Sequence, residues 1–422
     1  MLNSVWNELE DFMNYYSGVH RGTGIKSIIS SKVYDTSHDI IGHFVGADLA
    51  LDSVIMVKNT TEAINKLSYR LNLSSGDIII STDMEHHSND LPWRSKAAVS
   101  YLGIDEKGNL NSAELKNILK QNYPRVKLVA VCGASNVTGH INDVHLLAQT
   151  AHEFKCPILV DGAQLIPHRP FSMRPHNDPH HIDFLTFSGH KIFSPLGSGV
   201  LIGPRAFFDR GQPEYTGGGT VNVVTDDRIL WSDPPDKDEA GSPNVPGTFA
   251  LARTLVYLEH LGMQKLTRYE ENLTSYAFEK IKKLDGIHIY GDKNRVGVIS
   301  INIEGIPHAL VGAVLCFEAG IGVRTGCFCA QKYVRQLLGL KEVPIIPDSR
   351  QKHLLPGMVR ISLAAYNSKE EIDTLLQWLS VIRDNADEFK KRYKFSPKHD
   401  CFYPSGRDDR DIEAVYKRYL SV

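Results

Sequence analysis

Apolar and polar stretches alternate along residues 51–250 in the rhythm of strands and helices that follow one another in turn. Several apolar runs are continuous rather than alternating, which is typical of strands covered by helices on both faces. The pattern therefore predicts an α/β domain built on a mainly parallel sheet. Its expected strands are Ser53–Val57, Asp77–Ser81, Val126–Val131, Pro157–Val160, Ile182–Phe187 and Gly199–Ile202.

The pattern changes after a long helix expected near residues 249–284. Strands at Val296–Ile303 and Val359–Leu363 are mixed with helices near 307–319, 330–339 and 368–384, which indicates a smaller α+β domain. The tail is polar with scattered aromatic residues, and its basic run Lys390-Lys391-Arg392 is typical of a solvated face. We therefore expect four parts: an N-terminal helical segment that packs with the small domain (1–50), a large domain (51–285), the small domain (286–385) and a C-terminal appendage (386–422).

Composition narrows the class of protein. The chain has 422 residues, of which 42% are hydrophobic and 23% charged, and this suffices for a large core. Its formal net charge of −2 gives no electrostatic reason to expect nucleic acid or an anionic membrane as partner. No apolar run reaches the roughly 20 residues that span a bilayer. The first residues show no secretion signal, and six cysteines in so long a chain favour free thiols in a reducing cytoplasm.

Two of the expected strands end on residues that carry chemistry. One runs into Asp161-Gly162-Ala163-Gln164, and thirty positions after Asp161 stands Lys191, at the end of Ser188-Gly189-His190-Lys191. Pyridoxal phosphate chemistry needs a lysine for a Schiff base and an acid that keeps the pyridine nitrogen protonated. Ligands of open α/β sheets bind at the carboxyl ends of strands, where both signals fall. The alternative, a surface lysine after a core strand, is disfavoured by the preceding strand and its carboxylate.

Other short runs offer groups that such a cofactor requires. Thr60 and Thr61 open a helix, and together with Ser188 and His190 they are suited to a phosphate, whereas alone they indicate an ordinary helix cap. His86 is suited to stack on an aromatic ring. The pair His86-His87 is also compatible with a metal, but no third Cys or His stands at suitable spacing.

Three further residues keep two interpretations each. Asn136 is able to donate to the cofactor phenolate oxygen or to form an Asx turn. Cys329, in Arg324-Thr325-Gly326-Cys327-Phe328-Cys329, is either a reactive loop thiol or a small buried residue. Without a second cysteine pair a structural zinc is not expected. Arg360 is suited to a bidentate carboxylate or to a structural ion pair. The loop His176-Asn177-Asp178-Pro179-His180-His181 is taken as a loop without function.

With these residues in view, the chain resembles the class V aminotransferase superfamily of fold-type I pyridoxal phosphate enzymes. Within it, the chain is most similar to cysteine desulfurases and selenocysteine lyases, from about residue 20 to about residue 384. Nine motifs in the same order carry the resemblance: His20-Arg21-Gly22, Thr60-Thr61-Glu62-Ala63-Ile64-Asn65, Met84-Glu85-His86-His87-Ser88-Asn89, Ser135-Asn136-Val137, Val160-Asp161-Gly162-Ala163-Gln164, Ser188-Gly189-His190-Lys191, Glu239-Ala240-Gly241-Ser242-Pro243-Asn244, Arg324-Thr325-Gly326 with Cys329, and Tyr366-Asn367.

The resemblance implies a large sheet domain of seven-stranded type with a smaller α+β domain, and it implies roles for individual residues. Lys191 holds the cofactor and moves protons, and Cys329 is the nucleophile that takes the substrate sulfur as a persulfide. The cofactor ligands implied are Thr61, His86, Asn136, Asp161, Gln164, Ser188, His190, Lys191 and Ser242, and the substrate ligands are His20, Asn136, Arg324 and Arg360.

The function that the resemblance implies is a cytoplasmic, homodimeric cysteine desulfurase that converts L-cysteine to L-alanine. Ser242 matches a hydroxyl that such enzymes lend across the dimer interface, and a sulfur-acceptor protein is a further expected partner. The alternatives are another class V activity, such as a C–S lyase, a selenocysteine lyase or an aminotransferase-like enzyme, in which Cys329 is incidental, and a scaffold without cofactor.

Two departures from the family pattern stand out. Cys327-Phe328 replaces the two histidines that commonly precede the cysteine, and the resulting motif is closer to the desulfurase domain of molybdenum cofactor sulfurases. The usual N-terminal strand of the Tyr-Leu-Asp-Asn-Ala type is not found. Because two thiols stand one residue apart, we hypothesise that Cys327 relays or resolves the persulfide.

Overall fold

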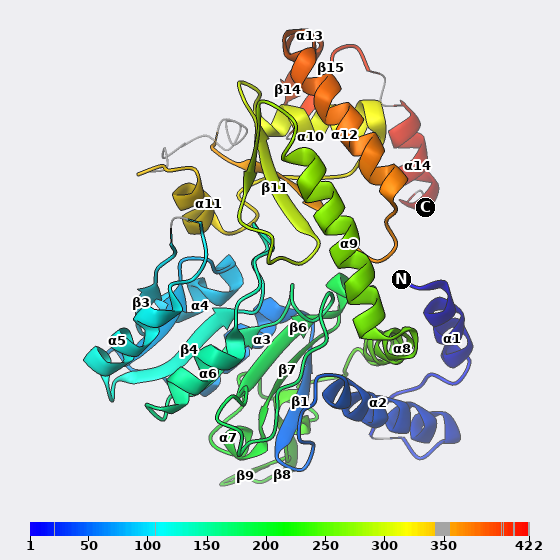
Figure 1. The fold of residues 1–422 in the computed structure, drawn as a ribbon. Coiled ribbons are helices and arrows are strands. Elements are labelled where there is room, and N and C mark those ends of the chain that lie inside the picture. The colour runs from blue at the N-terminus through cyan, green and yellow to red at the C-terminus, as the bar shows by residue number, and fades with distance from the viewer. Residues whose placement is uncertain are drawn as a thin grey trace. The chain divides into compact units, whose positions relative to one another are not determined.

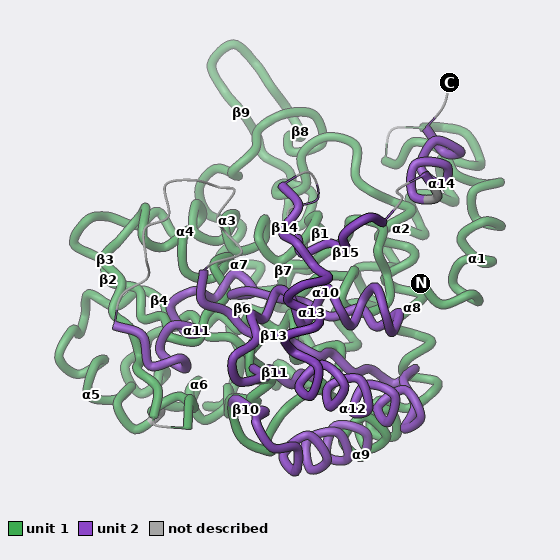
Figure 2. Tube along the Cα trace, turned by 90° about the horizontal axis from the view of Figure 1, so that it is seen from above, with its two compact units in different colours: residues 1–272, 291–297 green, residues 273–290, 298–422 purple. Residues whose placement is uncertain are grey.

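The chain forms two compact units (Figure 2): unit 1 comprises residues 1–272 and 291–297, and unit 2 comprises residues 273–290 and 298–422. The structure is a computed structural model. It describes the whole chain except residues 21, 106, 342–354, 398, 400, 408–409 and 421–422.

Unit 1 is built on a seven-stranded sheet with the strand order β1-β7-β6-β5-β4-β2-β3 (Figure 1). The five strands from β6 to β3 run parallel, while β7 is antiparallel to both of its neighbours. The large, mainly parallel sheet expected from the sequence is therefore confirmed. Its strands are β1 (Asp52–Val57), β2 (Ile78–Thr82), β3 (Ala98–Leu102), β4 (Val126–Cys132), β5 (Ile158–Asp161), β6 (Phe184–Ser188) and β7 (Gly199–Pro204).

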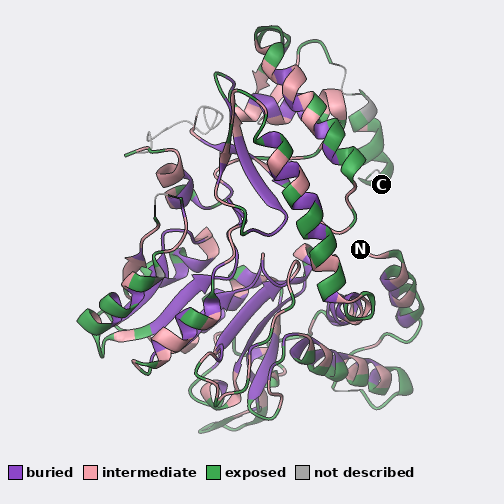
Figure 3. Ribbon diagram, in the orientation of Figure 1, coloured by how far each residue is buried: buried purple, intermediate pink, exposed green. Residues whose placement is uncertain are grey.

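Both faces of this sheet are buried except at the edge strand β3 (Figure 3). In β4, Val129 and Val131 belong to one hydrophobic cluster, whereas Leu128 and Ala130 belong to another. Since successive side chains of a strand point to opposite faces, helices must cover the sheet on both sides, which explains the continuous apolar runs of the sequence. The helical segments of unit 1 are α1 (Asn3–Met13), α2 (Ile25–Phe44), α3 (Thr60–Arg70), η1 (His87–Asn89), α4 (Leu91–Arg94), α5 (Ser112–Asn122), α6 (Val144–His152), η2 (Gly189–Lys191), α7 (Arg205–Phe208), η3 (Asp236–Asp238) and α8 (Val245–Leu261), and a hairpin is formed by β8 (Val221–Val224) and β9 (Ile229–Trp231).

The N-terminal helices α1 and α2 pack against α8, all within unit 1. Phe12 of α1 stacks on Phe249 of α8, with 4.8 Å between ring centroids. The expectation that residues 1–50 pack with the smaller domain stays a prediction. Within unit 1, the apolar face of α1, with Leu9 and Phe12, shares a cluster with Tyr34 and Val245.

Unit 2 contains a four-stranded antiparallel sheet in the order β10-β11-β13-β12. Its strands are β10 (Ile287–Tyr290), β11 (Val298–Ile303), β12 (Arg324–Gly326) and β13 (Met358–Ser362), and its helices are α10 (His308–Ala319), α11 (Gln331–Leu337), α12 (Lys369–Asp384), α13 (Ala386–Arg392) and α14 (Arg410–Leu420). The capping box of Ser368 and Glu371 begins α12. In the tail, β14 (Tyr393–Ser396) and β15 (Cys401–Pro404) form a hairpin, and Phe317 of α10 contacts Tyr403 edge to face at 4.9 Å.

The helix expected over 249–284 is in fact two helices, α8 and α9 (Met263–Ile281). The break falls at Gly262, whose φ of +86° lies in the region that only glycine adopts readily. The boundary between the two units lies within α9, after Asn272, rather than near residue 285.

Candidate active site

The carboxyl ends of the central strands of unit 1 surround a cavity of about 180 Å³. Parallel strands end at the same edge of a sheet, so residues far apart in the chain meet there. The cavity is lined by Asn59, Thr60, Thr61, His86, Ser88, Cys132, Ala134, Asn136, Asp161, Ala163, Gln164, Ser188, His190 and Lys191. Of the residues proposed from the sequence, it therefore brings together Thr61, His86, Asn136, Asp161, Gln164, Ser188, His190 and Lys191.

Asp161, the last residue of β5, supplies a buried carboxyl group. It pairs in register with Cys132 of β4 and with Thr186 of β6, and one of its carboxylate oxygens accepts a hydrogen bond from the Ala163 N–H at 2.9 Å. Burial raises the pKa of Asp161, while the charge of Lys191 lowers it. A cationic ligand group beside this carboxylate would stabilise its ionised form.

Lys191 closes the short turn η2 directly after β6, so the strand end places its amine at the cavity. The turn has little space: a Cβ at Gly189 would lie 2.6 Å from the Ser198 hydroxyl oxygen and 3.0 Å from two backbone oxygens. Glycine at this position therefore lets β6 bend sharply into the turn, close against residues 194–198.

A cradle for an anion lies at the start of α3. The Thr60 N–H donates to the Ser188 hydroxyl at 2.9 Å, and the Thr60 and Ser188 hydroxyls are 2.8 Å apart. The Thr61 hydroxyl lies 2.7 Å from that of Ser88. Helix N-termini carry partial positive charge and free N–H groups, which suits a phosphate. Burial and the charge of Lys191 lower the pKa of His190, so its imidazole is neutral at pH 7 and presents one N–H donor.

His86 lies in the turn between β2 and η1 and lines the same cavity. Its Nδ1 accepts a hydrogen bond from the Ser88 N–H at 3.1 Å and lies 3.0 Å from the Ser88 hydroxyl. These contacts fix the ring plane. A flat imidazole at the cavity wall is suited to stack on an aromatic ligand.

The cysteine loop belongs to unit 2 and follows β12. Cys329 is exposed, whereas Cys327 is half-buried and its thiol donates to the Pro356 carbonyl at 3.1 Å. Phe328 and Cys329 both have positive φ, +53° and +57°, so the loop makes a tight turn that points two successive side chains in unusual directions. Burial raises the pKa of the Cys327 thiol, and the charge of Cys329 raises it further.

Two guanidinium groups lie near this loop. Arg324 of β12 and Arg360 of β13 are partners in the register of the antiparallel pair, and Arg360 lies over the Phe328 ring at 5.1 Å. Burial and the positive charge of Arg324 lower the pKa of Arg360 to about 10, and the charge of Cys329 opposes this change. Two adjacent guanidinium groups favour an anionic ligand.

Two proposed residues of unit 1 lie elsewhere. His20 contacts Asp35 at 2.9 Å and lines a different cavity, together with Asp39, Asp52 and Asp236. Ser242 is exposed in the loop before α8 and is not among the residues that line the cavity of Lys191. Arg21, part of the first motif, lies outside the described residues.

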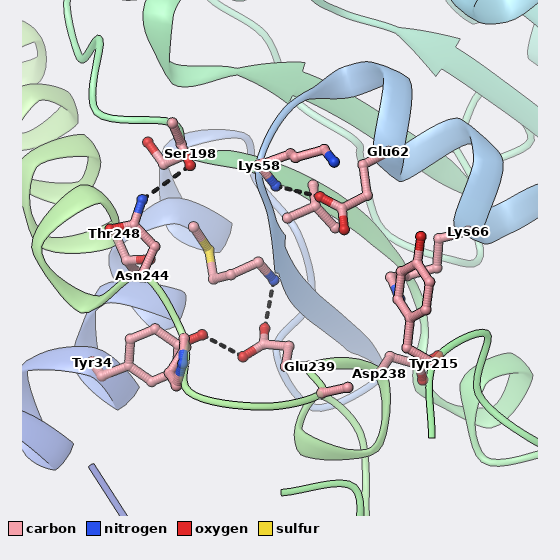
Figure 4. A pocket seen from close by; sticks show the side chains of 15 residues that line it. Tyr34, Lys58, Glu62, Lys66, Ser198, Tyr215, Asp238, Glu239, Asn244 and Thr248 are labelled. Carbon is pink, nitrogen blue, oxygen red and sulfur yellow. Dashed lines mark hydrogen bonds between the residues drawn. The ribbon is translucent and has the colours of Figure 1, made fainter. Parts of the chain in front are cut away.

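The loop that carries Ser242 begins at a buried carboxylate, Glu239, beside a further cavity of about 150 Å³ (Figure 4). Glu239 accepts hydrogen bonds from the Tyr34 hydroxyl, from the Met56 N–H and from His38 Nε2, the last at 3.0 Å. The charge of Glu239 raises the pKa of His38 to about 9, although burial alone lowers it. This ion pair holds α2 against β1 and fixes where the loop starts.

Sequence reasoning did not assign a role to Glu85, Cys132 or Glu239. Glu85 and Glu239 stood within motifs, but only the structure shows that their side chains are buried. In the described part of the chain, no group of three or more His, Cys, Asp or Glu side chains is arranged to hold a metal ion. Within the same residues, every helix is too short or too polar to cross a membrane.

Comparison with known proteins adds an independent observation. The sequence profile of the family "Aminotransferase class-V" matches residues 2–375. The chain is 33% identical to a cysteine desulfurase of Haloferax volcanii over 383 residues, which is 88% of this chain and 84% of that protein. It is 34% identical to a probable cysteine desulfurase of Staphylococcus aureus over 392 residues, 90% of this chain and 89% of that protein.

Solved structures are similar as well. The apo structure of a cysteine desulfurase from Thermococcus onnurineus matches with a TM-score of 0.79 and 31% identity, covering 91% of this chain and 92% of that chain. A cysteine desulfurase from Escherichia coli matches with a TM-score of 0.76 and 27% identity, with the same coverage of both chains.

Proposed function

Because the chain belongs to the class V aminotransferase family, we propose that it is a pyridoxal-phosphate-dependent cysteine desulfurase that converts L-cysteine to L-alanine and keeps the sulfur as a persulfide on Cys329. The observation that carries the proposal is the pair of Asp161 and Lys191 at one cavity of unit 1. The alternatives are other class V activities, in which the same fold acts without Cys329 as the sulfur acceptor.

The residues of the cavity fit the cofactor. Asp161 offers a buried carboxylate for the ring nitrogen, His86 a flat ring, the start of α3 with Ser188 and His190 a seat for the phosphate, and Lys191 an amine. Asn136 and Gln164, which also line the cavity, are assigned to the phenolate oxygen. When bound, pyridoxal phosphate supplies an electron sink that allows an amino acid to lose its α-proton and a group from its β-carbon.

The chain's own residues then perform the remaining steps. Lys191 takes the proton from the substrate α-carbon and returns protons to the product, which requires its amine to be neutral at that moment. Asp161 holds the proton at the ring nitrogen, because a buried carboxylate is stabilised by a neighbouring cation. Arg324 and Arg360 are assigned to the substrate carboxylate.

Cys329 is the proposed acceptor of the sulfur. The Cβ–Sγ bond of the substrate breaks as a bond forms between that sulfur and the Cys329 thiolate, and the β-carbon takes a proton to become the methyl group of alanine. Exposure of Cys329 leaves the persulfide accessible to a sulfur-acceptor protein. Cys327 is half-buried with a raised pKa, so it is the weaker nucleophile of the two.

We extend the proposal to assembly and location: a cytoplasmic homodimer in which Ser242 completes the phosphate seat of the second copy. Its exposure away from the cavity of its own unit supports this role. The likeness of the Arg324–Cys329 run to molybdenum cofactor sulfurases stays a prediction, since the compared relatives are cysteine desulfurases.

The test is a product assay with L-cysteine, L-selenocysteine and cysteine sulfinate. The proposal predicts alanine together with a persulfide on wild-type enzyme, and loss of both from L-cysteine in Cys329→Ala. Free sulfide with pyruvate from L-cysteine, unchanged in Cys329→Ala, would instead identify a C–S lyase.

A further inference from the structure

Glu85 is a carboxyl group buried directly behind the wall of the Lys191 cavity. Its side chain is 5% exposed and is not among the residues that line the cavity. One oxygen accepts hydrogen bonds from the Thr82 hydroxyl at 2.7 Å and from the Cys132 N–H at 2.9 Å. The other accepts one from the Asn89 side-chain amide at 2.7 Å. A buried carboxyl with this many donors requires an explanation, because burying an acid is costly.

These contacts join two elements that carry cofactor ligands. Thr82 and Asn89 bracket the turn that presents His86, and the Asn89 N–H also donates to the His86 carbonyl at 2.8 Å. Cys132 ends β4 and pairs in register with Asp161, whose carbonyl accepts the Gly133 N–H at 2.8 Å. Glu85 therefore connects the turn that carries His86 to the end of β5 that carries Asp161.

The charge of Glu85 depends on pH near neutrality. Burial raises its pKa to about 8; its hydrogen bonds with Thr82, Asn89 and Cys132 oppose this, and the charge of Asp161 adds to it. The titratable groups whose charge is coupled to that of Glu85 include Asp161 on β5 and the Cys132 thiol on β4. Burial raises the pKa of that thiol well above its usual range, so it stays neutral, and Lys191 acts on Asp161.

We propose that Glu85 is a positioning residue of the cofactor pocket: it locks the His86 turn to the strand end of Asp161, and its ionisation strengthens the hold of the site on a protonated ring nitrogen. This inference rests on the proposed function, because it needs a ligand with a basic ring nitrogen. It adds a residue that touches neither cofactor nor substrate.

The direction in which ligand affinity changes with pH follows from the thermodynamic linkage between ligand binding and proton binding. At pH 7 Glu85 is mostly protonated. A cationic ring nitrogen favours the ionised form of Glu85, so ligand binding lowers the pKa of Glu85. By reciprocity, ionisation of Glu85 increases ligand affinity, so the contribution of Glu85 to the affinity rises as pH increases through about 8.

The experiment uses the full-length apoprotein and pyridoxine 5′-phosphate, which keeps the ring nitrogen and phosphate but lacks the aldehyde that reacts with Lys191. Dissociation constants are measured by calorimetry between pH 7 and pH 9. We expect the ratio of wild-type affinity to Glu85→Gln affinity to rise about fivefold over this range, the lower end of typical coupling between sites, because titration of the free ligand affects both proteins equally and cancels in the ratio. Thr82→Val is the matched control, since it removes one hydrogen bond of the same turn and leaves the carboxyl in place, so the pH-dependent rise must remain.

A second ligand separates electrostatics from packing. The analogue with carbon in place of the ring nitrogen should bind wild type and Glu85→Gln with the same pH profile. If Glu85→Gln keeps the wild-type profile for pyridoxine 5′-phosphate, the inference is wrong while the cofactor site stands. If wild type does not bind pyridoxine 5′-phosphate at all, the proposed function itself fails.

A measurement on wild type alone covers the case in which Glu85→Gln does not fold. Infrared difference spectra of the apoprotein follow the carbonyl band of protonated carboxylic acids from pH 7 to pH 9. A band should disappear with a midpoint near 8, and pyridoxine 5′-phosphate should move that midpoint to lower pH. No such band, or a midpoint that the ligand leaves in place, would overturn the inference.

Discussion

The cavity of unit 1 and the cysteine loop of unit 2 hold their chemical groups in opposite ways. Asp161 is buried at the end of a strand in the middle of a sheet, with neighbours on both sides. Cys329 is exposed in a turn with positive φ beside the edge strand β12. A cofactor needs fixed partners, whereas a thiol that receives and passes on sulfur must be reached by other molecules. The difference suggests that damage to unit 1 removes both cofactor binding and turnover, while damage to the loop removes turnover of L-cysteine and leaves the cofactor bound.

The largest effect is expected from Lys191→Ala. The variant should lose the yellow colour of the bound cofactor, and turnover of L-cysteine should fall by about three orders of magnitude or more, because both attachment and proton transfer depend on this amine. Absorbance spectroscopy and an alanine assay measure the two losses. Wild-type turnover in the variant would contradict the role of the cavity.

Cys329→Ala tests the two regions separately, since it should remove the sulfur acceptor of unit 2 and leave the cofactor cavity of unit 1 intact. Alanine formation from L-cysteine should drop about a hundredfold or more, while the cofactor absorbance stays that of wild type. Matched spectra and a persulfide-labelling assay on the same preparation provide the measurement. Loss of the colour would mean that the loop also shapes the cofactor site.

Asp161→Asn should lower the turnover of the enzyme and raise the thermal stability of the apoprotein. Burial raises the pKa of Asp161 above its unfolded value of about 3.9. Ionisation of the buried carboxyl group therefore costs the apoprotein stability as pH rises above about 3.9, and the uncharged amide of the variant removes this loss. We expect a higher melting temperature of the apoprotein at pH 7 and a fall in turnover of about a hundredfold. Thermal melts with and without pyridoxal phosphate test this pair of changes. A lower melting temperature with normal turnover would refute it.

His38→Gln should affect only the stability of unit 1. The folded pKa of His38 is about 9, above its unfolded value of 6.5, so its contribution is present below pH 6.5 and is lost as pH rises through 9. At pH 6 the variant should be less stable by roughly 3 kcal/mol, and the deficit should shrink at alkaline pH. Urea denaturation across this range is the measurement, and a deficit independent of pH would exclude the ion pair with Glu239 as its cause.

The smallest effect is expected from Cys327→Ala, which serves as the matched control for Cys329→Ala. The thiol is half-buried and engaged with the Pro356 carbonyl, so turnover should change by less than about twofold. If sulfur transfer to a small thiol acceptor is unchanged as well, the relay hypothesis for Cys327 is wrong. A large loss of transfer with normal alanine formation would support the relay instead.

The contrast between the two regions also explains what the sequence predicted. Asp161 and Lys191 follow continuous apolar runs, and such runs identify buried strands and therefore their ends. The strands β3, β10 and β12 were not predicted, because Ala98–Leu102, Ile287–Tyr290 and Arg324–Gly326 are short and mostly less than fully buried. A half-buried strand is marked by alternating apolar and polar residues, and strands this short hold too few residues for the alternation to stand out.

The placement of single side chains depended on tertiary structure. The cluster at residues 20–22 resembled a substrate-binding motif, yet His20 lies with Asp35 in a separate cavity of unit 1. Burial of Glu85 and the ion pair of His38 with Glu239 join segments up to 201 positions apart, and no local pattern encodes them.

The proposed function requires a covalent bond between Lys191 and the cofactor. Purified protein incubated with pyridoxal phosphate, reduced with borohydride and digested should yield one modified peptide, the one that contains Lys191, in fragmentation mass spectrometry. Asp161→Asn should reduce the yield of this peptide at limiting cofactor. Modification spread over surface lysines, or a Lys191 peptide that stays unmodified, would contradict the assignment.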